Sequence, residues 1–160
     1  MTEKTFTSTF QIFDNLEELP TDIQNLMAEA CRVRDKAYAP YSNFQVGAAV
    51  LLENGKIISG SNQENASYPS GLCAERTAIY YAGAQFPEQK IHSLALSAKS
   101  LLHQTTVPIP PCGACRQAIA EYETKQNQPI TIYFMGETGK IIRSASLANL
   151  LPLAFDRTFL

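Results

Sequence analysis

The sequence has 160 residues, of which 45% are hydrophobic and 18% charged, with a formal net charge of -2. This length and apolar content fit one domain with a single substantial core. A slight negative charge provides no basic face for a phosphate backbone, so we expect no nucleic-acid partner. No segment approaches the ~20 apolar residues of a membrane helix and the N-terminus lacks a signal-peptide pattern, so we expect no membrane association and a cytoplasmic location.

Residues 1–20 are predicted to form an N-terminal arm ahead of a single domain at residues 21–160. In this arm Phe6, Phe10 and Ile12 are separated by polar residues. Such alternation is compatible with a short strand or with an arm that lies on the surface. We assign the arm no function.

Apolar residues recur at the spacing of one helix face between residues 23 and 37, with Thr21 or Asp22 available as the N-cap. This pattern predicts a first helix that packs on a sheet. The runs 44–52 and 57–60 flank an Asn-Gly turn and predict a β-hairpin, because this dipeptide tolerates positive φ angles.

Helical and strand patterns alternate through the rest of the chain. The expected elements are a helix at 73–84, a strand at 91–98, a helix at 112–122, a strand at 130–135, a short strand at 140–143 and a closing helix at 147–151. Together they predict an α/β fold, a three-layer α-β-α sandwich around a central mixed sheet of about five strands.

Three of the four cysteines are placed for metal chemistry. Cys112 and Cys115 lie three residues apart in the first turn of a predicted helix, and Cys73 lies where another predicted helix begins. The positive end of a helix dipole favours the thiolate, which is the form that binds metal. Three thiolates around zinc leave a fourth position open, as in catalytic rather than structural zinc sites.

Glu75, two residues after Cys73, adds an acid/base group to this site. Zinc lowers the pKa of a bound water, and a nearby carboxylate can accept the proton and deliver it elsewhere. A Cys-x-Glu motif followed by Pro-Cys-x-x-Cys is the signature of zinc deaminases with three cysteine ligands. The competing interpretation is a surface glutamate that the helix dipole alone favours.

Other interpretations of the cysteines fit less well. Cys31, His92 and His103 have no ligand-like spacing, so we expect them to be packing residues. A thioredoxin-type Cys-x-x-Cys pair is disfavoured by the preceding prolines and the absence of Trp. A structural zinc ribbon needs a fourth ligand and usually a second close pair.

With these motifs in view, the chain from about Ile23 to Phe155 resembles the small homotetrameric zinc-dependent cytidine deaminases. The resemblance rests on several blocks that occur in the order of that family. They are residues 38–42, 44–49, 62–69, 73–78, 111–117 and 150–152.

The resemblance implies hydrolytic deamination of cytidine and deoxycytidine to uridine and deoxyuridine with release of ammonia, as in pyrimidine salvage. Cys73, Cys112 and Cys115 would hold one Zn²⁺ per chain. Glu75 would protonate ring N3 of cytosine and then carry a proton to the leaving amine. The substrate would be a free pyrimidine nucleoside.

The resemblance also implies the substrate contacts. Asn62 and Glu64 would bind the sugar hydroxyls, Phe44 would flank the nucleoside, and Ala74 would offer backbone polar groups to the pyrimidine. Phe155 would reach a neighbour's base in a homotetramer with shared active sites. Packing within the chain is the alternative for Phe44 and Phe155, and a solvated loop position is the alternative for Glu64.

Arg76 is expected to offset the excess charge of three thiolates on zinc, because a guanidinium can donate to the sulfurs. Its alternative is an ordinary surface arginine. Two alternative functions for the whole chain remain. A blasticidin-type aminonucleoside deaminase would use the same cysteines and glutamate, and a non-catalytic zinc protein would not need Glu75.

Overall fold

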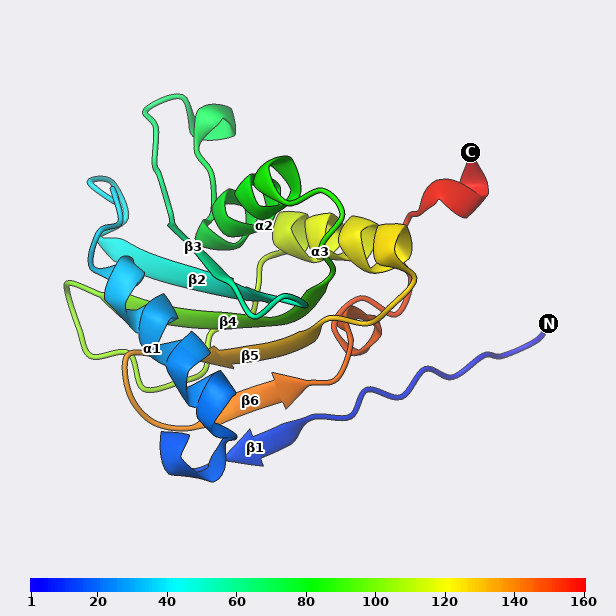
Figure 1. The fold of residues 1–160 in the computed structure, drawn as a ribbon, viewed down its shortest axis with the longest axis horizontal. Coiled ribbons are helices and arrows are strands. Elements are labelled where there is room, and N and C mark those ends of the chain that lie inside the picture. Colours follow the sequence, from blue (N-terminus) through cyan, green and yellow to red (C-terminus); the bar gives the residue numbers. More distant parts are fainter.

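The computed structural model describes all of residues 1–160 and contains one six-stranded sheet in the order β1-β6-β5-β4-β2-β3 (Figure 1). β4 and β5 are parallel, and the other neighbouring strands are antiparallel. The strands are β1 Gln11–Phe13, β2 Phe44–Leu52, β3 Ile57–Ser61, β4 Ile91–Ser100, β5 Thr131–Met135 and β6 Ile141–Ser144.

Three α-helices cover the two faces of this sheet. They are α1 Thr21–Arg34, α2 Ala74–Gln85 and α3 Gly113–Gln126. Figure 1 shows α1 on one face and α2 and α3 side by side on the other. The predicted three-layer α/β sandwich is therefore confirmed. None of the helices combines the length and apolarity needed to cross a bilayer.

Alternating strand residues supply two separate apolar layers. On the α1 side, Leu26 and Met27 pack with Ala49 of β2 and Tyr133 of β5. On the other side, residues of α2 and α3 such as Ile79 and Ile119 pack with Val50, Leu94 and Ile132. The strands through the middle of the sheet are thus buried on both faces, as their continuous apolar sequence predicts.

The expected number of about five strands was one too low, since the count left out β1. Residues 11–13 of the N-terminal arm pair with β6, with Gln11 opposite Arg143 and Phe13 opposite Ile141. A strand of three residues is too short to show a clear alternation of apolar and polar residues. It forms only because a partner strand distant in sequence is available. The division between an arm at 1–20 and a domain at 21–160 remains a prediction.

Two local expectations were wrong. The N-cap of α1 is Pro20, whose carbonyl accepts from the N–H groups of Ile23 and Gln24, and neither Thr21 nor Asp22 caps the helix. The closing helix expected at 147–151 is only a 3-10 turn at Leu147–Asn149. Pro152 follows this segment directly and cannot continue a helix.

Glycine permits two features that the rest of the fold needs. Gly55 has φ +81 in the turn between β2 and β3, which confirms the predicted hairpin. Gly47 lies where α1 crosses β2, and a Cβ there would lie 2.0 Å from the carbonyl oxygen of Ala30. Only glycine lets the helix approach the strand this closely.

Candidate active site

Two helix starts on the same side of the sheet present the cysteines. Cys73 and Cys112 are the N-cap residues of α2 and α3, both in extended conformation, and neither side chain caps its helix. Their thiols therefore remain available as ligands. Cys115 follows in the first turn of α3 and is completely buried.

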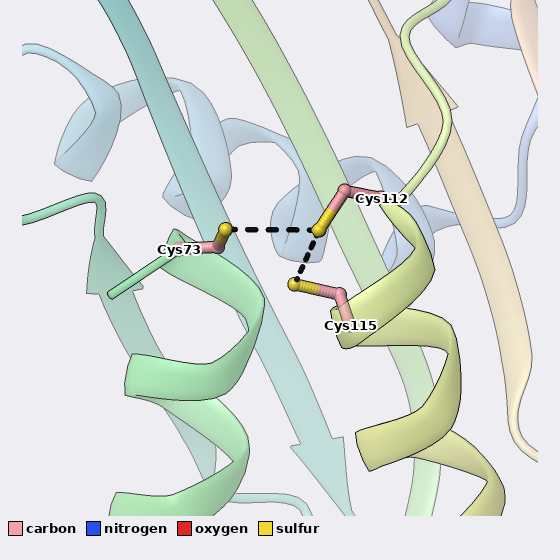
Figure 2. A group of neighbouring side chains, drawn as sticks. All are labelled: Cys73, Cys112 and Cys115. Atoms are coloured by element: carbon pink, nitrogen blue, oxygen red, sulfur yellow. Dashed lines mark hydrogen bonds between the residues drawn. The ribbon is translucent and has the colours of Figure 1, made fainter. Parts of the chain in front are cut away.

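The three sulfurs converge on one point (Figure 2). Cys112 Sγ lies 3.8 Å from Cys73 Sγ and 3.5 Å from Cys115 Sγ, and all three sulfurs lie within 4.8 Å of one another. Zn–S bonds of about 2.3 Å in a tetrahedral arrangement separate sulfurs by roughly 3.8 Å. The spacing and softness of this donor set fit zinc, and Cys31, His92 and His103 lie outside the group.

The thiols differ in how readily they ionise. Hydrogen bonding from Cys115 lowers the pKa of Cys73 to about 5, with help from Arg76 and against the effect of burial. The pKa of Cys115 is raised, because its proton is shared with Cys73 and because the group is buried. Metal binding must therefore displace the Cys115 proton, so zinc affinity depends on pH.

Arg76 lies against this cluster. Its Nη2 donates to Cys73 Sγ at 3.5 Å, and its Nε is buried without a hydrogen-bond partner. The Cys73 thiolate raises the pKa of Arg76 above its ordinary value. The half-buried guanidinium is thus placed to draw charge from the sulfurs, as the sequence predicts, although its effect on turnover remains a prediction.

Glu75 is buried, with 5% of its surface exposed, and it is not part of the sulfur group. Burial raises its pKa to about 7, and the charge of Cys73 adds to the rise. The alternative of a solvent-exposed surface glutamate is therefore wrong. Its environment gives the carboxyl a pKa suited to taking up and releasing a proton near neutral pH.

A cavity of about 430 Å³ connects these groups with the predicted substrate residues. This volume falls within the range of small-molecule sites. Its lining residues come from the loop before β2, from β2 and β4, from the segment after β3, from the start of α2 and from the connection before α3. They are Ser42, Phe44, Val46, Asn62, Glu64, Cys73, Glu75, Leu96, Ala98, Ile109, Pro110 and Cys112.

Asn62 is held by the backbone of β2. Its Oδ1 accepts from Val46 N at 2.8 Å, and its Nδ2 donates to Phe44 O at 2.9 Å. One N–H of Nδ2 and one lone pair of Oδ1 remain for a ligand. The amide is therefore oriented before any substrate arrives.

Glu64 is fixed by its neighbours in a different way. Its carboxylate accepts from the N–H groups of Tyr41 at 2.9 Å and Ser42 at 3.2 Å, and from the Ser42 hydroxyl. The Ser42 hydroxyl, followed by the two backbone N–H groups, lowers the pKa of Glu64. This carboxylate is thus ionised and pointed at the cavity rim by an adjacent loop rather than solvated freely.

Two predicted substrate residues do not line the cavity with their side chains. Ala74 is the first residue of α2, between Cys73 and Glu75, and its side chain is fully buried. The contact predicted for Ala74 uses its backbone groups and remains a prediction. Phe155 is 59% exposed and stacks on Phe159, with ring centroids 5.7 Å apart. Within one chain, Phe155 is therefore not brought to the site.

The sequence did not single out several residues of the cavity. Ser42 orients Glu64, and Ile109 and Pro110 form part of the wall. Ile109 and Pro110 directly precede the Pro-Cys block, so their position in the chain was the available signal. Leu96 and Ala98 resemble any other buried strand residues in sequence, so no sequence signal marks them as cavity residues.

The comparisons with known proteins agree with this geometry. A family model described as "Cytidine and deoxycytidylate deaminase zinc-binding region" matches residues 20–129. The cytidine deaminase of Halalkalibacterium halodurans is 42% identical over 134 residues, covering 84% of this chain and 94% of the relative. The cytidine deaminase of Sporosarcina psychrophila is 40% identical, covering 85% and 93%.

Solved structures show the same similarity. The 1.6 Å crystal structure of cytidine deaminase from Burkholderia pseudomallei matches with a TM-score of 0.71 and 38% identity, covering 82% of this chain and 97% of that one. The cytidine deaminase of Mycobacterium tuberculosis matches with a TM-score of 0.66 and 30% identity, covering 86% and 99%.

Proposed function

The chain belongs to the cytidine and deoxycytidylate deaminase family, and we propose that it is a zinc-dependent cytidine deaminase, which hydrolyses cytidine and deoxycytidine to uridine and deoxyuridine. One observation carries the proposal. A buried, non-coordinating carboxyl at Glu75 shares a cavity with the Cys73 and Cys112 sulfurs and with the polar pair Asn62 and Glu64.

Cys73, Cys112 and Cys115 would hold zinc, which would supply Lewis-acid activation of the attacking water near neutral pH. Arg76 donates to Cys73 and would draw charge from the sulfurs, so that a bound cation would remain a stronger Lewis acid. Glu75 is close in sequence and space to these ligands but free to exchange protons.

Proton movement is the task of Glu75. Its carboxylate takes a proton from the attacking water and delivers it to ring N3 of the cytosine, which makes C4 a better electrophile. After the water oxygen has bonded to C4, Glu75 carries the remaining proton of that oxygen to the amino nitrogen as the C4–N bond breaks, and ammonia leaves. A group with a pKa of about 7 can both accept and donate at neutral pH.

The remaining cavity residues orient the nucleoside. The free N–H and lone pair of Asn62 and the carboxylate of Glu64 bind sugar hydroxyls, and Phe44 packs against the nucleoside. No lysine, arginine or histidine lines this cavity, whereas two carboxylates do. A phosphate placed beside Glu64 would be repelled by its carboxylate, so a free nucleoside is favoured over a nucleotide or polynucleotide.

The exposed Phe155 gives a reason to propose a homotetramer. It lies after the predicted Leu-Leu-Pro block, its ring stacks on Phe159, and 59% of its surface is exposed, so the ring is available to complete the site of a neighbouring chain. The cysteine thiols of the protein must stay reduced to bind zinc, which fits a cytoplasmic enzyme of pyrimidine salvage.

The test is an assay of purified protein with one equivalent of zinc on cytidine, deoxycytidine, deoxycytidine monophosphate and blasticidin S. We expect turnover of both nucleosides and little or none of the other two. Turnover of blasticidin S alone would assign the rival deaminase, preference for the monophosphate would overturn the argument from Glu64, and zinc binding without any turnover would indicate a non-catalytic zinc protein.

A further inference from the structure

The connection between β4 and α3 carries one zinc ligand and part of the cavity wall. Cys112 ends this connection, and Ile109 and Pro110 line the cavity. Three prolines at positions 108, 110 and 111 remove three N–H donors from a short segment. The segment therefore depends on bonds that its carbonyl groups accept.

A single side chain provides that anchor. Arg116 Nε donates to Pro111 O at 2.9 Å, and no other hydrogen bond involves residues 106–111. Upstream, the nearest fixed point is Thr105, whose carbonyl accepts from Glu137 N at 2.7 Å. Between Thr105 and Cys112, Arg116 makes the only hydrogen bond to the backbone, and Pro111 is otherwise held by burial of its ring.

The same guanidinium reaches a second carbonyl. Arg116 Nη1 donates to Leu150 O at 2.9 Å, at the beginning of the C-terminal segment that leads to Phe155. Charge-assisted bonds of this kind are stronger than neutral ones, and the planar fork of arginine can serve two acceptors at once. One side chain thus joins the metal loop to the C-terminal segment.

We propose that Arg116 is a positioning residue that fixes Pro111 and thereby holds Cys112 in the zinc site and Ile109 and Pro110 in the substrate wall. It acts through the peptide carbonyl adjacent to the ligand and touches neither zinc nor substrate. Without this bond Pro111 keeps only its packing contacts, so we expect the Cys112 sulfur to be held less firmly at the spacing that fits zinc.

The experiment measures zinc transfer from the purified zinc-loaded protein to a colorimetric chelator, which needs no turnover. We expect Arg116→Ala to release zinc roughly 10-fold or more faster than wild type, since loss of a residue behind a ligand typically costs about 10–100-fold in metal affinity. Arg116→Lys retains a cation but serves one acceptor at most, so its zinc-release rate should fall between those of wild type and Arg116→Ala.

The matched control is Gln117→Ala. Gln117 Nε2 donates to Phe155 O at 2.7 Å, so this variant loosens the C-terminal segment and leaves Pro111 untouched. Zinc release should stay at the wild-type rate. Equally faster zinc release from both alanine variants would overturn the proposal, because the effect would then come from the C-terminal segment. Zinc release from Arg116→Ala at the wild-type rate would overturn it as well.

A second readout concerns the wall and rests on the proposed function. In zinc-saturated Arg116→Lys, we expect KM for cytidine to rise several-fold more than kcat falls, because Ile109 and Pro110 line the cavity that would hold the substrate whereas Glu75 is unchanged. A fall in kcat at constant KM would contradict the role in the wall. Absence of turnover in wild type would refute the proposed function and leave the zinc-release comparison valid.

Discussion

Replacing Glu75 with glutamine is expected to remove most activity and, in the metal-free protein, to increase stability. The side chain is 5% exposed, and its pKa is raised from 4.5 to about 7, chiefly by burial. Glutamine has the same shape but cannot ionise or transfer a proton. A positioned acid/base typically contributes about 100- to 10,000-fold, so kcat should fall by that factor.

The gain in stability follows from the same shift. The ordinary pKa of 4.5 and the raised pKa of about 7 differ by roughly 2.5. At about 1.36 kcal/mol for each pKa unit, this difference corresponds to roughly 3 kcal/mol in the free energy of unfolding. Because the pKa of this acid is higher in the folded state, folding binds protons, and Glu75 destabilises the protein as the pH rises from about 4.5 to about 7. Glutamine should therefore stabilise at about pH 8 and have little effect near pH 4.5.

The assay is urea unfolding with a chelator and a reductant at about pH 8 and about pH 5, with the exposed Glu121→Gln as control. Added zinc should reduce the gain of Glu75→Gln, because a divalent cation nearby stabilises the carboxylate that glutamine lacks. An equal change in free energy of unfolding at both pH values would refute the argument, because it would not come from titration of Glu75.

Four other substitutions test the remaining parts of the site and fold. Cys112→Ala should lose stoichiometric zinc, measured by metal analysis, and should melt at a lower temperature; retention of one zinc per chain would contradict its role. Arg76→Ala should keep its circular dichroism spectrum while kcat falls about 10- to 100-fold, and a wild-type kcat would dismiss the charge argument. Glu64→Ala should raise KM for cytidine far more than it changes kcat, whereas an unchanged KM would remove Glu64 from the sugar site. Gly47→Ala forces a Cβ to within 2.0 Å of Ala30 O unless α1 shifts, and should lower the free energy of unfolding by about 1–3 kcal/mol; an unchanged urea midpoint would contradict this packing argument.

The metal centre was predictable because its determinants are local. A Cys-x-Glu and a Pro-Cys-x-x-Cys at predicted helix starts specify which side chains crowd each N-terminus. The sequence contains no signal for the distance between Cys73 and Cys112, which depends on α2 and α3 packing side by side on one sheet face. The prediction that both helices deliver sulfurs to one point rested on the position of the cysteines at two helix starts and is confirmed by the geometry.

Features that depend on a distant partner were less predictable. Strand β1 requires β6, more than 100 residues away, and its three residues have no distinctive pattern. The anchor from Arg116 to Leu150 and the wall formed by Leu96 are also long-range, and their residues are ordinary in sequence. The N-cap prediction for α1 was wrong for a different reason, since the N-cap residue is Pro20, which has no polar side chain and accepts through its carbonyl.

Two carboxyl groups line the same cavity, and their surroundings move their pKa values in opposite directions. Burial and the Cys73 charge raise the pKa of Glu75 to about 7, whereas the Ser42 hydroxyl and two backbone N–H groups lower that of Glu64. A group that remains ionised serves as a fixed acceptor, and one poised near neutrality can exchange protons. The environments, rather than the residue type, therefore support the proposal that Glu64 binds substrate and Glu75 transfers protons.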